Sequence, residues 1–310
     1  MKFMQVLQAI NIQSIYMYIM YTFVTVLLSV ICYLLSGLTN LKNHAKLINM
    51  ILTPINIIPA EYPAELLPLL SGAKLYDSSC SREASVVFID KDGGYFLKSA
   101  PKGKLEREAA LTRYFHGKGL SAEVLSYISG ERDRLLTAKI HGDDCTAAKY
   151  LEQPKRLCDI YAERLALLHA EDFTGCPIQN HTELYLAKAA ENKRADTFDK
   201  SQFPDSFGYK SAAEAWAVVE KHGHLLKTDT LLHGDFCLPN IILNNWKFSG
   251  FIDLDCGGVG DRHVDIFWGI YTFWFNLKTN KYRERFIDAY GRSNIDEDML
   301  RIIAAIEVFC

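Results

Sequence analysis

The stretch that decides the fold spans residues 231–265 and reads LLHGDFCLPNIILNNWKFSGFIDLDCGGVGDRHVD. Three of its polar residues, Asp235, Asn240 and Asp253, lie in or beside apolar segments that are typical of strands. A turn that contains Pro239 separates Asp235 from Asn240, and Asp253 ends the segment FID. A strand–turn–strand hairpin between Asn240 and Asp253 would bring these two side chains together at its open end.

These residue types suit phosphoryl transfer. That reaction needs a carboxylate that orients the attacking hydroxyl, and it needs an amide and a second carboxylate that hold Mg²⁺ on the phosphates. A single Asp or Asn in a turn is more often a cap of the local backbone, and that interpretation stays open for each residue taken alone. The ordered set of three at this spacing favours phosphoryl transfer.

The segment before this stretch is predicted to form a small sheet with one helix. Its elements are strands over 84–90 and 95–98 around a Lys-Asp-Gly-Gly turn, a helix over 105–118, and a second hairpin over 124–128 and 134–140. The remainder is mostly helical. Helices are predicted over 155–170, 183–193, 212–221, 261–276, 282–290 and 296–309, with short strands over 230–232, 241–243 and 248–254. We therefore expect a sheet-rich lobe over 59–140 and a helix-rich lobe over 141–310.

The pattern HGDxxxxN followed by GFID resembles the catalytic and metal-binding segments of the aminoglycoside phosphotransferase family, and most closely those of the aminoglycoside 3′-phosphotransferases, the kanamycin and neomycin kinases. The segments CLPNI, GVGDRxxDI, LEREAALTRYF and the final AIEVF extend the resemblance over about residues 59–309. It implies an α+β, two-lobed, protein-kinase-like fold that binds ATP and Mg²⁺. The implied reaction is phosphorylation of the 3′-hydroxyl of a kanamycin- or neomycin-type antibiotic, which gives resistance.

The resemblance also implies roles for individual residues. In the catalytic segment, Asp235 matches the catalytic aspartate, His233 the histidine that supports its loop, and Asn240 and Asp253 the two Mg²⁺ ligands. In the nucleotide site, Lys98 matches the lysine that holds the phosphates, and Glu108 matches its glutamate partner, with Glu106 as the rival. The remaining nucleotide-binding candidates are Ser79, Cys80 and Ser81 in the loop over the phosphates and Thr137, Ala138 and Ile140 in the linker that holds adenine.

An aminoglycoside is a polycation, so its site should be acidic. The candidates that the resemblance suggests for contact with the acceptor are Asp199, Glu307 and Phe309. Two departures leave the acceptor open, because Cys256 stands where the family often has an arginine and Cys310 follows the usual terminal Phe. The alternatives are a kinase of choline, a macrolide or an amino sugar on the same fold, or a catalytically silent, membrane-tethered, kinase-like binding module.

The first 58 residues form an apolar extension that the resemblance does not cover. No Asp, Glu, Lys or Arg occurs between Lys2 and Lys42, and residues 15–38 are apolar over a length that suffices for a membrane span. A buried core helix, or upstream translation before a start at Met50, are the alternatives. We expect membrane contact only through residues 15–38 and a catalytic domain in the cytoplasm, since the lysines that follow the span favour that side.

Overall composition narrows the range of partners. The 310 residues contain 34 Lys and Arg against 37 Asp and Glu, a net charge of −3. That balance argues against a nucleic-acid partner bound through bulk charge. The eight cysteines contain no CxxC pair, which is typical of a reducing compartment. A small-molecule acceptor is the expected partner, and a monomer or a dimer is equally compatible with the sequence.

Overall fold

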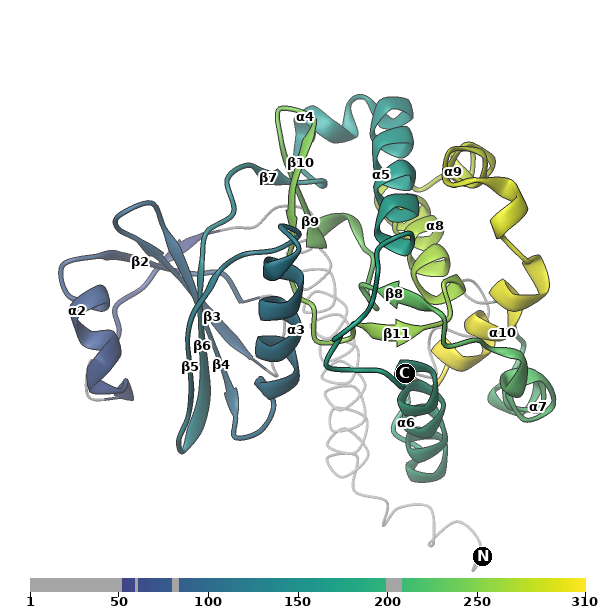
Figure 1. Cartoon of the computed structure of the whole chain (residues 1–310), viewed down its shortest axis with the longest axis horizontal. Coiled ribbons are helices and arrows are strands. Elements are labelled where there is room, and N and C mark those ends of the chain that lie inside the picture. The colour runs from purple at the N-terminus through teal and green to yellow at the C-terminus, as the bar shows by residue number, and fades with distance from the viewer. Residues whose placement is uncertain (1–51, 59–60, 80–83, 199–207) are drawn as a thin grey trace, which may run out of the picture. The chain divides into compact units, whose positions relative to one another are not determined.

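The computed structural model of this chain describes residues 52–58, 61–79, 84–198 and 208–310 (Figure 1). A sheet-rich lobe is followed by a helix-rich lobe, so the predicted α+β, two-lobed arrangement is confirmed. The predicted apolar helix over 15–38 lies outside the described residues. Within the described ranges, none of the helices has the length and apolarity needed to cross a membrane.

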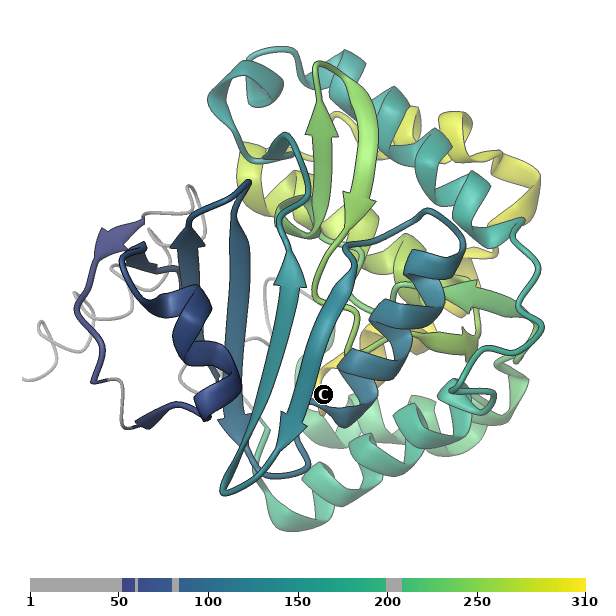
Figure 2. The ribbon, with the colours of Figure 1, turned by 60° about the vertical axis from the view of Figure 1, so that its left-hand side comes forward.

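The first lobe is built on a six-stranded antiparallel sheet with the order β1-β2-β3-β4-β6-β5. The strands are β1 (Thr53–Pro54), β2 (Lys74–Asp77), β3 (Ser85–Asp90), β4 (Tyr95–Pro101), β5 (Val124–Ser129) and β6 (Arg132–Ala138). Helix α3 (Glu106–Gly117) lies against one face, beside β5 in Figure 2, and the short helices η3 (Ala64–Leu66) and α2 (Leu67–Leu70) pack on the opposite face.

Alternation along β4 determines where its side chains go. Leu97 is fully buried in the cluster that contains Leu66 and Leu70. Ala100 packs in a separate cluster with Leu105 and Ala109 beside α3. Successive side chains of a strand point to opposite faces. Lys98 therefore lies on the face that carries α3, whereas Leu97 belongs to the other face.

The second lobe is mainly helical. Its helices are α4 (Ala148–Leu151), α5 (Pro154–His169), α6 (His181–Ala195), α7 (Ala212–His222), α8 (His263–Leu277), α9 (Arg283–Tyr290) and α10 (Glu297–Glu307), with short turns η5 (Gly223–Leu225), η6 (Leu238–Asn240) and η7 (Arg292–Asn294). Two small sheets complete it: β10 (Lys247–Phe251), β9 (Ile241–Asn244) and β7 (Asp143–Asp144) form one, and β11 (Gly258–Gly260) with β8 (Thr230–Leu232) forms the other.

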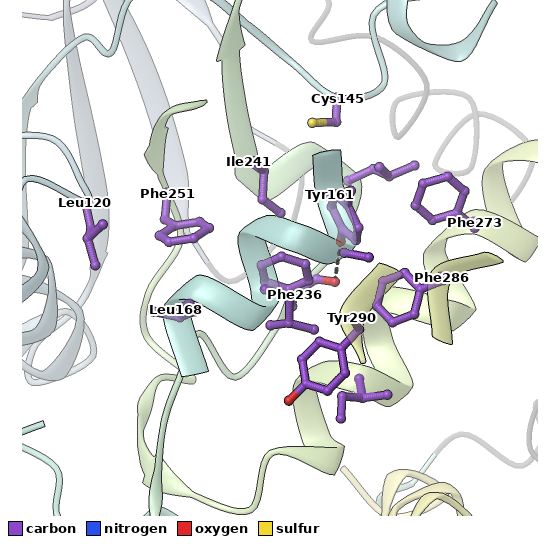
Figure 3. Packing of buried hydrophobic residues seen from close by; sticks show 14 of the residues in the cluster. Leu120, Cys145, Tyr161, Leu168, Phe236, Ile241, Phe251, Phe273, Phe286 and Tyr290 are labelled. Carbon is purple, nitrogen blue, oxygen red and sulfur yellow. Dashed lines mark hydrogen bonds between the residues drawn. The ribbon is translucent and has the colours of Figure 1, made fainter. Parts of the chain in front are cut away.

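The core of this lobe surrounds α5 (Figure 3). The Tyr161 and Phe236 rings lie 4.5 Å apart, and Phe273 and Phe286 pack against Tyr161. The Tyr161 hydroxyl donates a hydrogen bond of 2.5 Å to the Phe236 carbonyl. Because Phe236 follows Asp235 directly, this buried bond fixes the backbone of the segment that contains the candidate catalytic residue.

Some element boundaries differ from the predictions. Strand β10 ends at Phe251 rather than at residue 254, because Asp253 adopts a left-handed backbone with φ 59° that a strand does not contain. Strand β11 occupies a glycine-rich segment in which the sequence analysis predicts no strand. A side chain at Gly260 would lie 2.6 Å from the His181 ring, so the packing of α6 on this strand requires glycine there.

Candidate active site

The β9–β10 hairpin brings the two candidate metal ligands to one end of the same structure. Asn245 and Trp246 form its two-residue turn with φ of 49° and 68°, as a type I′ turn requires. At the other end, Phe251 pairs with Ile241, and the Ile252 N–H donates to the Asn240 carbonyl at 3.0 Å. Asn240 and Asp253 therefore flank the open end of the hairpin, as the sequence predicts.

Asp235 and Asn240 are directly bonded. The Asn240 side-chain amide donates to the Asp235 carbonyl at 2.9 Å and to its carboxylate at 2.8 Å. Burial raises the pKa of the Asp235 carboxyl, and the nearby His233 opposes that rise. With its nitrogen committed to Asp235, the Asn240 amide leaves its oxygen as the atom able to bind a cation.

The buried Asp265 carboxylate at the start of α8 holds the loop that carries Asp235. It accepts the His233 N–H at 2.8 Å and the Gly234 N–H at 2.7 Å. Burial opposes ionisation of this carboxyl, but the hydrogen bond and charge of His169, 3.2 Å away, hold its pKa below the ordinary value. Gly234 has φ 86°, and a side chain there would lie 1.9 Å from the Cys256 carbonyl. The loop is therefore fixed on two sides.

His233 is fully buried and connects the two halves of the site. One ring nitrogen, Nε2, lies 3.0 Å from the Ile252 carbonyl, and the other, Nδ1, lies 3.3 Å from the Asp235 N–H. His233 thus joins the backbone beside Asp253 to that of Asp235, which fits the supporting role that the resemblance implies.

A lysine from the first lobe meets the hairpin end. Lys98 Nζ lies 2.8 Å from Glu108 Oε2 and 2.7 Å from Asp253 Oδ1. Glu108 is buried whereas Glu106 is exposed, because residues two positions apart point to different sides of a helix. Of the two glutamates considered from the sequence, Glu108 is therefore the one that contacts Lys98.

The charges of this trio affect each other. Burial raises the pKa of Glu108 to about 7, although Lys98 opposes that rise. Burial also disfavours the charged Lys98, but Asp253 and Glu108 hold its pKa above the ordinary value. The pKa of Asp253 lies below its usual value because the charge of Lys98 outweighs burial. The Asp253 side chain remains 50% exposed, so its carboxylate is accessible to a ligand.

The other nucleotide-site candidates are placed only in part. Ser79 Oγ accepts the Val86 N–H at 2.9 Å, and Ser79 N–H donates to Asp77 at 2.9 Å; Cys80 and Ser81 lie outside the described residues. Thr137 and Ala138 end β6, and the Ala138 N–H donates to the Glu123 carbonyl at 3.0 Å. Ile140 is near the second lobe, because a side chain at Gly250 would lie 2.6 Å from it.

The acceptor candidates are more enclosed than the sequence predicts. Glu307 accepts from the Tyr185 hydroxyl at 2.6 Å and from the Trp268 ring N–H at 3.0 Å, and burial raises its pKa to about 7. The Phe309 ring is fully buried against Phe198 and Trp216, so it is a core side chain and does not face an acceptor. Asp199 lies outside the described residues.

Sequence reasoning missed three residues around the site. Arg107 donates to the Gly257 carbonyl at 2.8 Å, yet between two glutamates on a helix it reads as a solvated face residue. Tyr185 and Trp268 hold Glu307, yet aromatic residues at helical spacing read as ordinary core. The adjacency of Arg107 to the candidate Glu108 was the one available signal.

The donor set suits a hard cation. Asn240 and Asp253 offer oxygen atoms, which Mg²⁺ prefers, and two protein ligands suffice when phosphates and waters complete the octahedron. In the described part of the chain, no group of three or more His, Cys, Asp or Glu side chains is arranged to hold a metal alone.

Comparisons with known proteins identify relatives of this chain. Residues 80–303 match the model of the phosphotransferase enzyme family. A probable aminoglycoside 3′-phosphotransferase of Lactococcus lactis subsp. lactis strain IL1403 is 50% identical over 250 residues, which are 80% of this chain and 95% of that protein.

Two solved structures show the same fold. The crystal structure of an aminoglycoside 3′-phosphotransferase of type VIII has a TM-score of 0.65 at 20% identity, covering 81% of this chain and 96% of the other. An aminoglycoside phosphotransferase of Streptomyces rimosus, solved with ADP and streptomycin, has a TM-score of 0.62 at 21% identity, covering 73% and 90%. This likeness confirms the predicted fold. From the family match and the 50% identity, we conclude that this chain belongs to the phosphotransferase enzyme family.

Proposed function

We propose that this protein transfers the γ-phosphoryl group of ATP to the 3′-hydroxyl of an aminoglycoside of the kanamycin or neomycin type. The observation that carries the proposal is the convergence of three distant segments on one site: Lys98 and Glu108 from the first lobe, the bonded Asp235–Asn240 pair, and Asp253. The acceptor class rests on the 50% identical relative, which is named as a probable aminoglycoside 3′-phosphotransferase.

The nucleotide would lie where the first lobe, residues 59–140, meets the second lobe, residues 141–310. Lys98 would bind the phosphates through its ammonium group, and the buried Glu108 would hold that group in place. Asn240 and Asp253 would hold Mg²⁺, which neutralises phosphate charge as the transferred group leaves. The backbone and hydroxyl donors of residues 79–81 and the linker residues Thr137, Ala138 and Ile140 remain proposed contacts for phosphates and adenine.

Asp235 would accept a hydrogen bond from the acceptor hydroxyl and align it with the γ-phosphorus. The transition state of phosphoryl transfer is loose, so alignment and charge stabilisation contribute more than early removal of the proton. The bond from Asn240 and the bracing of its loop by Asp265 fix the Asp235 carboxylate before the acceptor arrives. A site of this kind is preorganised for in-line attack.

Glu307 is the described acidic residue that we propose for the acceptor ammonium groups, with Asp199 as a second candidate. A phosphorylated antibiotic carries new negative charge and binds its anionic ribosomal target less well, which would give resistance. Because ATP is a cytoplasmic substrate, we place the catalytic domain in the cytoplasm. Residues 15–38 remain the one segment that we propose for membrane contact.

The test is ATP turnover by the purified full chain with kanamycin, followed by phosphorus NMR and mass analysis of the product. We expect kanamycin-dependent release of ADP and a 3′-phosphorylated product. Asp235→Ala should lower kcat by at least about a hundredfold with little change in KM for ATP, whereas Asp298→Ala, an exposed control on α10, should not. Turnover with choline, a macrolide or an amino sugar but not with kanamycin would refute the acceptor assignment. Absence of turnover with every acceptor would refute the proposal that the protein is a phosphotransferase.

A further inference from the structure

Arg107 joins the two lobes through a contact that the proposed reaction does not use. Its guanidinium Nη2 on α3 donates to the Gly257 carbonyl at 2.8 Å. Gly257 lies in the loop that follows β10 and that contains Asp253. Arg107 also directly precedes Glu108, the partner of Lys98. One helix therefore contacts both the lysine of the site and the loop of the candidate metal ligand.

The loop is tightly packed against the second lobe. Its Cys256 carbonyl lies where a side chain at Gly234 would be, and a side chain at Gly257 would lie 3.0 Å from the Leu232 carbonyl. Towards the first lobe, two side-chain contacts hold the loop: Lys98 with Asp253, and Arg107 with Gly257. At the start of the same segment, the Phe251 N–H also donates to the Leu120 carbonyl at 2.8 Å. The two side-chain contacts therefore add to a backbone bond in holding the loop beside α3 and β4.

The two contacts differ in what the proposed ligands would do to them. If Lys98 binds phosphates and Asp253 binds a cation, both groups of the 2.7 Å contact acquire ligand partners that compete with it. The Gly257 carbonyl accepts from Arg107, and neither group is among those that we propose to bind ligand. On this proposal the ligands compete with the Lys98–Asp253 contact but not with the bond from Arg107.

We propose that Arg107 is a positioning residue that keeps the Asp253 loop in register with the Lys98–Glu108 pair once the metal–nucleotide complex has replaced the contact between Lys98 and Asp253. The inference rests on the proposed nucleotide site. It assigns to Arg107 an effect on the binding of a metal–nucleotide complex, exerted through Asp253 and without contact to either ligand.

The alternative is that Arg107 only stabilises the fold. The Arg107 Nε is buried and has no hydrogen-bond partner among the residues that the structure describes, a cost that a purely stabilising side chain would avoid. A lysine at this position could donate one bond to the Gly257 carbonyl without burying an unpaired second donor. Arg107→Lys keeps the charge and the bond while it removes the unpaired group, so it tests whether the bond to Gly257 carries the effect, and the comparison of Mg·ADP with metal-free ADP separates the two roles.

The experiment measures binding of Mg·ADP and of metal-free ADP by calorimetry on the full chain. We expect Arg107→Ala to weaken Mg·ADP binding about tenfold, the value of one hydrogen bond to a charged group, and to change metal-free ADP binding much less. Arg107→Lys should recover most of the loss. Arg113→Ala, an exposed arginine on the same helix, is the matched control and should bind as wild type does.

Three outcomes would overturn the inference. In the first, Arg107→Ala binds Mg·ADP as tightly as Arg113→Ala does. In the second, its affinities for Mg·ADP and for metal-free ADP fall by the same factor. In the third, the loss of binding equals the fraction of protein that urea denaturation shows to be unfolded. If Arg107→Ala does not fold, Arg107→Met, which keeps the packing of the side-chain stem, takes its place with the same expectations. A wild-type protein that binds no Mg·ADP would instead refute the proposed function, and the inference with it.

Discussion

Replacing Glu307 by Gln should make the protein more stable at alkaline pH. Glu307 is buried at the end of α10, and both of its hydrogen bonds, from Tyr185 and Trp268, reach the same oxygen, Oε1. A glutamine keeps a carbonyl oxygen at that position, so both bonds survive the change. What the change removes is the buried negative charge, together with its proximity to Asp235.

The magnitude follows from the pKa. Burial raises the pKa of Glu307 from 4.5 to about 7. At pH values between these two, the folded protein binds more protons at this carboxyl than the unfolded chain does, so stability falls as pH rises. The contribution is complete below pH 4.5 and is lost as pH rises through 7. A shift of this size corresponds to about 3 kcal/mol.

The assay is urea denaturation of wild type and Glu307→Gln at pH 4.5, 6 and 8. The variant should match wild type near pH 4.5 and exceed its unfolding free energy by up to about 3 kcal/mol at pH 8. Glu220→Gln, an exposed glutamate on α7, is the control and should show no pH-dependent difference. A difference that stays constant with pH, or a less stable variant at pH 8, would refute the reasoning.

Three further changes test the packing and charge of the site. Gly234→Ala should cost about 3 kcal/mol of unfolding free energy, because the added carbon would overlap the Cys256 carbonyl at φ 86°; a urea midpoint equal to that of wild type would contradict this contact. Asp265→Asn replaces one of the two accepting oxygens by an N–H donor, so either the His233 or the Gly234 N–H loses its acceptor, and stability should fall by about 2 kcal/mol with a reduced kcat. Thermal melting and turnover check both, and unchanged turnover would exclude a role in bracing Asp235. Lys98→Met should leave Glu108 without its cationic partner and raise the pKa of that carboxyl further. Mg·ADP binding should weaken at least about tenfold. Binding as tight as that of the exposed control Lys102→Met would exclude Lys98 from the nucleotide site.

The sequence predicted those elements whose patterns are local. Strands of alternating apolar residues and helices of regular spacing were placed within a few residues, as for β8 and α7, because burial of one face repeats along the segment. Strand β11 was missed because Gly260 is required by the close approach of His181 on α6 and Gly258 by that of Ile178, which no local pattern reveals. The short strands β2 and β7 were missed since their partners lie in other segments.

In the candidate site, too, local relations could be predicted from the sequence and contacts between distant segments could not. Asn240 and Asp253 could be paired from the sequence because one hairpin connects them. The contact between Lys98 and Asp253 required the family resemblance, since 155 positions separate them and no periodicity relates them. The bond from Arg107 to the Gly257 carbonyl could not be predicted from the sequence. Every residue has a backbone carbonyl, so the partner of such a bond depends on the path of a distant loop and not on a residue type.

The irregular pairing inside the β9–β10 hairpin determines which changes of chain length the site can accept. Phe248 pairs with Leu243 and Gly250 with Ile242, so Ser249 is an extra residue opposite no partner of its own. Deletion of Ser249 would keep every pair on both sides of it, whereas deletion of a paired residue such as Ile242 would shift the register and turn the side chains beyond it to the opposite face. Length variation among relatives should therefore concentrate at Ser249 and at the Asn245–Trp246 turn. The paired positions should keep their number, because they fix the spacing between the Asn240 amide and the Asp253 carboxylate.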